Sequence, residues 1–123
     1  MNSVRKMAIG AIAAMMLLGI GMARAADRTF TGEIMDSACA AMGSHATMQK
    51  GKDATDPAVK KACTEACVKM GGKYVLYNAT RKATYKLDDQ EKPADFAGQK
   101  VKVTGTYDAK TKTIHVTNIE PAT

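Results

Sequence analysis

Alternation of apolar and polar residues, together with one short apolar run at 74–77, predicts one β-strand near the start of the chain and four more in its second half. In residues 28–35, Phe30, Gly32 and Ile34 alternate with threonine and glutamate, so one face of the strand would be apolar and the other polar. The other four strands are expected at 73–78, 83–87, 100–107 and 114–119.

One helix is expected between the first two strands. The periodicity is lost from residue 36 to residue 55, which predicts a loop of about 20 residues. Asp56 is then a good N-cap, Pro57 suits the first helical position, and glycines 71 and 72 would end the helix. Its expected buried stripe consists of Val59, Ala62, Cys63, Ala66, Cys67 and Met70. Its expected exposed side consists of Lys60, Lys61, Thr64, Glu65 and Lys69.

Five short strands and one helix indicate a mainly β protein, a small five-stranded barrel of the OB type. The helix follows the first strand here, whereas the usual OB helix follows the third, so we describe the expected fold as OB-like with one inserted helix. The last strand needs one irregularity, because Ile119 is out of phase with Ile114. A β-bulge near Thr117 would bring both side chains to the core.

The first residues have the pattern of a cleavable signal peptide. Arg5 and Lys6 precede an uncharged apolar run at 7–22, and the small-x-small sequence at 23–25 suits signal peptidase. The apolar run is shorter than the roughly 20 residues that a membrane-spanning helix needs. We therefore expect residues 1–25 to be a signal peptide and the protein to be periplasmic or secreted.

Residues 26–123 would then form a single OB-like domain, in which 36–72 is an inserted loop and helix. Loss of three basic residues with the signal peptide lowers the formal net charge from +6 to about +3. This mild charge does not favour a nucleic-acid partner. No later segment is apolar enough to predict stable membrane insertion.

The odd number of cysteines is the most informative chemical feature of the chain. In an oxidising compartment, Cys39, Cys63 and Cys67 leave at least one thiol without a partner in the chain. That thiol must be buried, bound to a metal, reactive, or paired with another molecule.

Cys63 and Cys67 are four residues apart on the expected helix, so their side chains share one face. Cβ atoms about 5–6 Å apart suit two ligands of one ion better than a disulfide, which needs about 3.8 Å. Cys39 and His45 on the preceding segment would complete a set that suits tetrahedral Zn²⁺, while soft sulfur ligands suit Cu(I) equally well. The expected ligands of Cu(I) or Zn²⁺ are Cys39, His45, Cys63 and Cys67, with Met42 or Met48 as optional additions.

A second interpretation stays open. A disulfide from Cys39 to Cys63 or Cys67, with the third thiol buried, would give a structural or protein-interaction module without a metal. No enzyme is expected, because nothing beside Cys39 and His45 supplies a recognisable oxyanion site. A metal ion is the expected partner, an unidentified periplasmic protein is a further candidate, and His115 is expected to be exposed.

Three sequence segments carry a resemblance. They are G-E-I-M-D-S-A-C at 32–39, C-T-E-A-C-V-K-M-G-G-K-Y-V-L at 63–76, and V-K-V-T-G-T-Y at 101–107 followed by I-H-V-T-N-I at 114–119. With them the chain resembles a group of small, uncharacterised exported bacterial proteins with an OB-like C-terminal half. The resemblance implies a periplasmic or secreted location and no established activity. The C-x₃-C pair is also similar to that of exported copper chaperones serving cytochrome oxidase. Those have a thioredoxin fold and a proline where this chain has Val68, which favours convergence.

Overall fold

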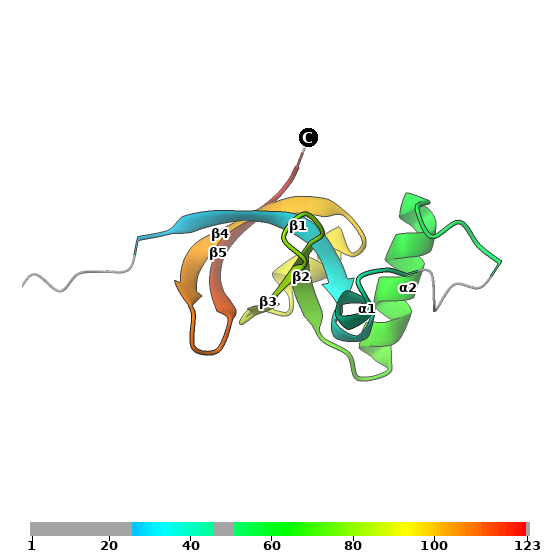
Figure 1. Cartoon of the computed structure of the whole chain (residues 1–123), viewed down its shortest axis with the longest axis horizontal. Coiled ribbons are helices and arrows are strands. Elements are labelled where there is room, and N and C mark those ends of the chain that lie inside the picture. Colours follow the sequence, from blue (N-terminus) through cyan, green and yellow to red (C-terminus); the bar gives the residue numbers. More distant parts are fainter. Residues whose placement is uncertain (1–25, 46–50, 123) are drawn as a thin grey trace, which may run out of the picture.

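The computed structural model describes residues 26–45 and 51–122 (Figure 1). The predicted signal peptide, residues 1–25, and Met48 lie outside the described residues. The elements are β1 (Arg28–Asp36), α1 (Ser37–Met42), α2 (Pro57–Lys69), β2 (Tyr74–Asn78), β3 (Ala83–Leu87), the 3₁₀ helix η1 (Lys92–Phe96), β4 (Lys100–Asp108) and β5 (Thr113–Pro121). The prediction of a mainly β protein with a helix after the first strand is confirmed. None of the helices in these ranges is long and apolar enough to cross a membrane.

The five strands form one sheet that closes on itself in the order β1-β2-β3-β5-β4, with β4 paired again to β1. Strand β1 serves two neighbours, because residues 28–33 pair with β4 and residues 33–36 pair with β2. Gly32 lies where β1 passes from one neighbour to the other. A Cβ atom at Gly32 would collide with the carbonyl oxygen of Tyr77, so this crossing requires glycine.

The predicted bulge in the last strand is confirmed. The register of β5 against β4 shifts at Thr117, which has no partner on β4. Because of this extra residue, Ile114 and Ile119 are both buried although they are out of phase in the sequence.

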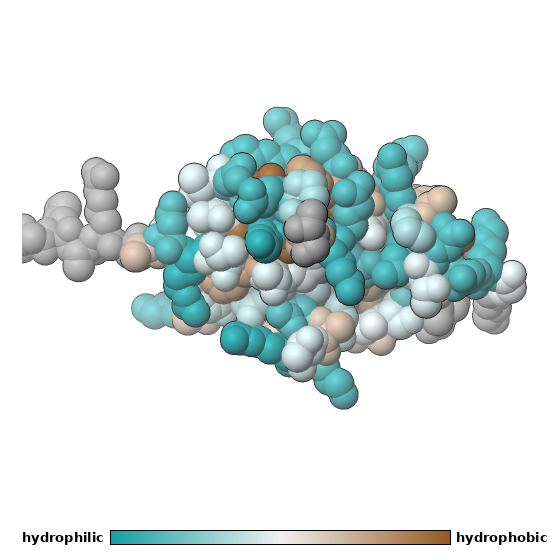
Figure 2. All heavy atoms as spheres, turned by 90° about the horizontal axis from the view of Figure 1, so that it is seen from above, coloured by the Kyte–Doolittle hydropathy of each residue, from teal (hydrophilic) through white to brown (hydrophobic). Residues whose placement is uncertain are grey.

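The inward-facing side chains of the strands form the main core. Its buried members are Phe30, Ile34, Tyr74, Leu76, Leu87, Ala97, Val101, Val103, Ile114 and Ile119. A second, smaller cluster lies where β1 ends and α1 and α2 come together (Figure 1), and it consists of Met35, Cys39, Ala40, Cys63, Cys67 and Val75. The surface in Figure 2 is mostly hydrophilic, with only small apolar patches, as expected when the apolar residues are gathered into these two clusters.

Helix α2 has the predicted position, but a different buried face. Asp56 is its N-cap and accepts the backbone N–H of Ala58 at 2.8 Å. We expected Thr64 to be exposed and Met70 to be in the core. Instead Thr64 is 0% exposed and Met70 is 74% exposed. The helix contacts the rest of the protein through a narrow face, and Met70 lies at the C-cap, beyond the last turn.

Helix α1 corrects the prediction of a loop over residues 36–55. The segment 37–42 becomes helical because Asp36 caps its first turn and small, helix-compatible residues follow. Its length of 6 residues is too short to show a periodic apolar stripe, which is the signal on which the helix prediction depended.

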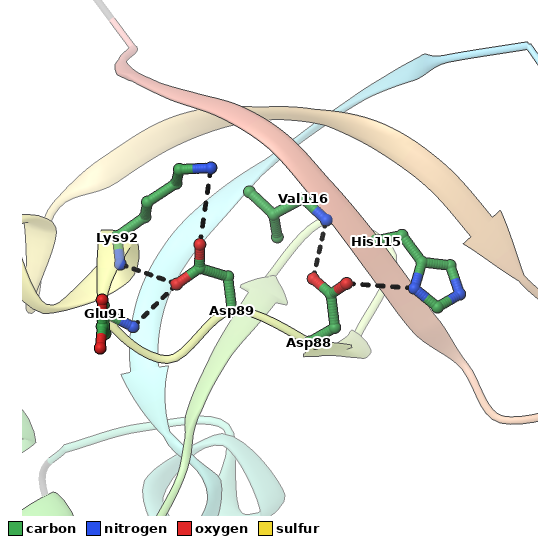
Figure 3. Close-up of polar contacts among 6 residues, drawn as sticks. All are labelled: Asp88, Asp89, Glu91, Lys92, His115 and Val116. Atoms are coloured by element: carbon green, nitrogen blue, oxygen red, sulfur yellow. Dashed lines mark hydrogen bonds and ion pairs between the residues drawn. The ribbon is translucent and has the colours of Figure 1, made fainter.

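The sheet closes at its weakest pairing, the parallel contact between β3 and β5, which has only the pairs Lys86–Thr113 and Leu87–Ile114. Asp88 strengthens this connection directly after β3 (Figure 3). Its Oδ1 accepts the N–H of Val116 at 2.8 Å, and its Oδ2 lies 3.1 Å from Nδ1 of His115. His115 is exposed, as predicted. Burial raises the pKa of Asp88, but the bonds to Val116 and His115 outweigh it and hold the pKa below its usual value.

Because its pKa is lowered in the folded state, Asp88 stabilises the fold above its unfolded pKa of about 3.9. That stability is lost as the pH falls through the folded pKa. We expect Asp88→Asn to lower the free energy of unfolding at neutral pH by less than about 1 kcal/mol, since the contact is half exposed. Urea unfolding as a function of pH should show this difference disappearing as the pH falls from the unfolded pKa through the lowered folded pKa. Asp27→Asn, which removes an exposed carboxylate before β1, is the control, and a difference for Asp88→Asn that persisted in acid would contradict the assignment.

Thr64 provides a second test of the fold. Its Oγ1 is buried and has no hydrogen-bond partner within the described ranges. Thr64→Val should therefore raise the free energy of unfolding by about 1–2 kcal/mol, because valine has the same shape and a similar helix propensity but no unsatisfied hydroxyl. The exposed change Thr29→Val should have almost no effect in the same urea experiment. A destabilised Thr64→Val would show that the hydroxyl has a partner.

Candidate metal centre

Asp36 lies at the junction of β1 and α1 and is completely buried. Its Oδ2 accepts the N–H groups of Ala38 and Cys39, each at 3.1 Å, and so caps α1. Its Oδ1 is also buried, and no described residue forms a hydrogen bond with it. The cap therefore fixes the carboxylate while leaving one oxygen available to a ligand.

Cys39 of α1 and Cys63 of α2 meet beside this carboxylate. Their Sγ atoms are 3.8 Å apart, and the two residues are 0% and 2% exposed. A disulfide would require about 2.05 Å, so both thiols are free. Two sulfurs on one tetrahedral Zn²⁺, each at a bond length of about 2.3 Å, would be separated by about 3.8 Å. Two thiols in van der Waals contact can have the same spacing. The polar groups beside them must therefore distinguish a metal-binding pair from simple packing.

His45 completes the cluster. Helix α1 ends at Gly43, whose φ of 71° lets the chain turn back toward the sheet. His45 is 3% exposed, and within the described part of the chain neither ring nitrogen has a hydrogen bond. Its Nε2 lies 3.4 Å from Oε2 of Glu33, while Oε1 of Glu33 lies 2.9 Å from Nζ of Lys60.

The structure thus gathers four donor groups at one point. One ligand atom from each of Asp36, Cys39, His45 and Cys63 lies within 4.8 Å of the other three, and all four residues are buried. The set contains one carboxylate oxygen, one imidazole nitrogen and two sulfurs, which are the donor types that Zn²⁺ takes in four-coordinate sites.

Three of these four residues were predicted from the sequence, and Asp36 was missed. The available signal was the sequence Asp-Ser-Ala-Cys directly after a strand. An N-cap aspartate accepts the N–H of the third helical residue, which here is Cys39, so the carboxylate and the thiol are brought close together.

Cys67, the fourth predicted ligand, lies beside the group and not within it. It is one helical turn after Cys63 on the same face of α2, 8% exposed, and part of the same buried cluster. Burial raises the pKa of its thiol, and the Asp36 carboxylate and the Cys63 thiol contribute in the same direction. Met42 has a side chain that is 45% exposed, and Met48 is outside the described residues.

Burial keeps the Cys39 thiol protonated near neutral pH. It raises the pKa of Cys39 far above the ordinary cysteine value, and the Asp36 carboxylate and the Cys63 thiol raise it further. A bound cation would reverse this balance, because a metal stabilises the thiolate that coordinates it.

A pocket of about 640 Å³ adjoins the cluster. Of the four donor residues only His45 lines it, together with Glu33 and Lys60. The pocket therefore reaches the cluster from its imidazole side, and the other three donors are enclosed by protein.

The comparison with known families finds a match for most of the sheet and for none of the four candidate donors. Residues 68–122 match a family described as a protein of unknown function, DUF5818. The match begins directly after Cys67, so it covers β2 to β5 and none of the four clustered donors. No curated protein and no solved structure matches the chain.

The different exposures of the three thiols predict the order in which they react. In the folded, metal-free protein we expect iodoacetamide to alkylate Cys67 first, because it is the least buried of the three. Cys39 and Cys63 should react at least about tenfold more slowly, since they require local opening of the fold. Peptide mapping by mass spectrometry after short labelling times measures this order. Labelling of Cys39 before Cys67 would contradict the arrangement described.

Proposed function

We propose that this chain is an exported, OB-like binding protein, not an enzyme, that holds one soft or borderline metal ion, Zn²⁺ or Cu(I). The observation that carries the proposal is the approach of four buried donor atoms, from Asp36, Cys39, His45 and Cys63, to within 4.8 Å of one another.

The polar atoms of the cluster distinguish it from an ordinary apolar core. Burying a carboxylate oxygen or an imidazole without a hydrogen bond costs free energy, and native proteins rarely leave such groups unsatisfied. Asp36 and His45 both have buried atoms that no described residue satisfies. A cation between them and the two sulfurs would satisfy the free carboxylate oxygen of Asp36 and one ring nitrogen of His45 at once.

The donor set favours Zn²⁺ over Cu(I) as the first choice. Zn²⁺ accepts carboxylate, imidazole and thiolate ligands in tetrahedral sites, whereas Cu(I) prefers sulfur. With two thiolates and one carboxylate, a Zn²⁺ complex would carry a net charge of only about −1, which limits the cost of enclosing it.

The OB-like assignment and the exported location rest on separate support. A closed five-stranded sheet whose last strand pairs with the third and the fourth is compatible with the OB type, although the helix is inserted after the first strand. The basic start, the apolar run at 7–22 and the small residues at 23–25 support export. An unidentified periplasmic protein is a further candidate partner.

The second candidate function is a disulfide-stabilised module without a metal. The 3.8 Å separation of the Cys39 and Cys63 sulfurs favours it, because a modest movement would bring them to bonding distance. That movement would leave the buried Asp36 and His45 atoms unsatisfied, which is why we place it second.

Zinc binding by protein purified under reducing, oxygen-free conditions tests the proposal. In competition with a chromophoric chelator, we expect about one Zn²⁺ per chain. Cys39→Ser and Cys63→Ser should each weaken Zn²⁺ binding by more than about 100-fold. This loss is larger than the one that follows mutation of residues that only hydrogen-bond to metal ligands. His115→Ala, on the exposed contact with Asp88, should bind zinc normally.

Protein collected from the periplasm separates the two candidates. A metal content near one per chain with reduced cysteines would support the metal site, and mature protein that begins at Ala26 would support export. Suppose instead that the protein as collected has one free thiol per chain, and that it takes up no metal even after its disulfide is reduced. That result would refute the metal site in favour of the disulfide module.

A further inference from the structure

A third sulfur lies next to the four donors without belonging to them. Cys67 follows Cys63 by one turn on α2, and both side chains join Cys39 in one buried cluster. The zinc-type set of Asp36, Cys39, His45 and Cys63 leaves this sulfur unused.

Two overlapping ligand sets therefore share the pair Cys39 and Cys63. One set adds Asp36 and His45, and its mixture of oxygen, nitrogen and sulfur suits Zn²⁺. The other adds Cys67 and consists of sulfur alone, which suits Cu(I). Exchange between the two ligand sets requires little movement of the backbone. A cysteine moves its sulfur between staggered positions by rotation about the single Cα–Cβ bond.

The released groups have places to go. The Nε2 of His45 lies 3.4 Å from Oε2 of Glu33, so a small rotation of the imidazole would give it a hydrogen-bond partner when it does not bind a metal. Asp36 keeps its hydrogen bonds from Ala38 and Cys39 in either case. Its negative charge would then lie beside three thiolates, which opposes Cu(I) binding and makes Asp36 a residue that discriminates between the two ions.

We propose that Asp36 and Cys67 are alternative ligands that divide this site between two metals. Zn²⁺ binds to Asp36, Cys39, His45 and Cys63, and Cu(I) binds to Cys39, Cys63 and Cys67. This inference rests on the proposed metal-binding function and adds to it the residues that determine which ion is held.

Two variants should shift the two affinities in opposite ways. Cys67→Ser should weaken Cu(I) binding at least about tenfold and change Zn²⁺ binding by less than about threefold. Asp36→Asn should weaken Zn²⁺ binding at least about tenfold and leave Cu(I) binding unchanged or tighter, because it removes a negative charge. Asparagine is as good an N-cap as aspartate, so α1 should persist.

Both affinities are measured on the full mature protein without oxygen, with chromophoric chelators of Zn²⁺ and of Cu(I) as competitors. Ala66→Ser introduces the same hydroxyl at an exposed position one residue before Cys67 and should alter neither affinity. Circular dichroism of the metal-free variants checks that each is folded. X-ray absorption at the copper edge should show sulfur neighbours only.

Several results would overturn the inference. A Cys67→Ser variant that loses both metals equally would make Cys67 a common ligand, and one that keeps Cu(I) would make it a bystander. Nitrogen or oxygen neighbours at copper would also contradict the all-sulfur set. If the unmodified protein binds zinc as proposed, these failures concern the inference alone. If it binds neither metal, the proposed function fails together with the inference.

Discussion

The carboxylate of Asp36 is the contact on which the site depends. Pairing of Asp36 with Tyr74 at the end of β1 fixes its backbone within the sheet. One of its oxygens caps α1 and thereby positions Cys39, while the other is buried without a hydrogen bond among the described residues. Asp36 is fixed by the sheet, and its side chain in turn fixes the position of Cys39 among the candidate donors. This is the reason a short helix with few contacts of its own can hold a thiol in a defined position.

The part of the sheet from β2 onward and the candidate site are distinct parts of the sequence. The family match spans residues 68–122 and so describes the closed sheet from β2 onward. The four donors come from the end of β1, from α1 and the residues after it, and from α2. The paired strands β1 and β2 support the segment that connects them, and this segment with the end of β1 carries the four candidate donors. A likeness in the sheet alone consequently carries no information about metal binding.

The sequence was sufficient for the features that local signals determine. Period-two alternation identified most of the strands, and the apolar run at 74–77 identified β2. The out-of-phase Ile119 identified the bulge, and Asp56 with Pro57 identified the start of α2. The burial of Thr64 could not be predicted, because it depends on how α2 is rotated against the sheet. For the same reason the sequence could suggest Cys39, His45 and Cys63 as candidate donors, but not that Asp36 would lie among them while Cys67 lay to one side.

The attachment of α2 gives the proposed metal a structural consequence. The residues that this helix buries are Cys63, Thr64 and Cys67, and these offer little apolar area. The helix has further contacts through the partly buried Val68, which packs against the main core, and through the ion pair of Lys60 with Glu33. A backbone contact adds to these, since a Cβ atom at Gly98 would collide with the backbone nitrogen of Lys61. Buried apolar surface stabilises by about 25 cal/mol per Å², and the three buried residues of α2 contribute little of it. An ion bound by Cys63 on α2, Cys39 on α1 and Asp36 on β1 would join all three elements, so its binding free energy would also stabilise the fold. The residues that hold the ion would thus also fix the helices to the sheet.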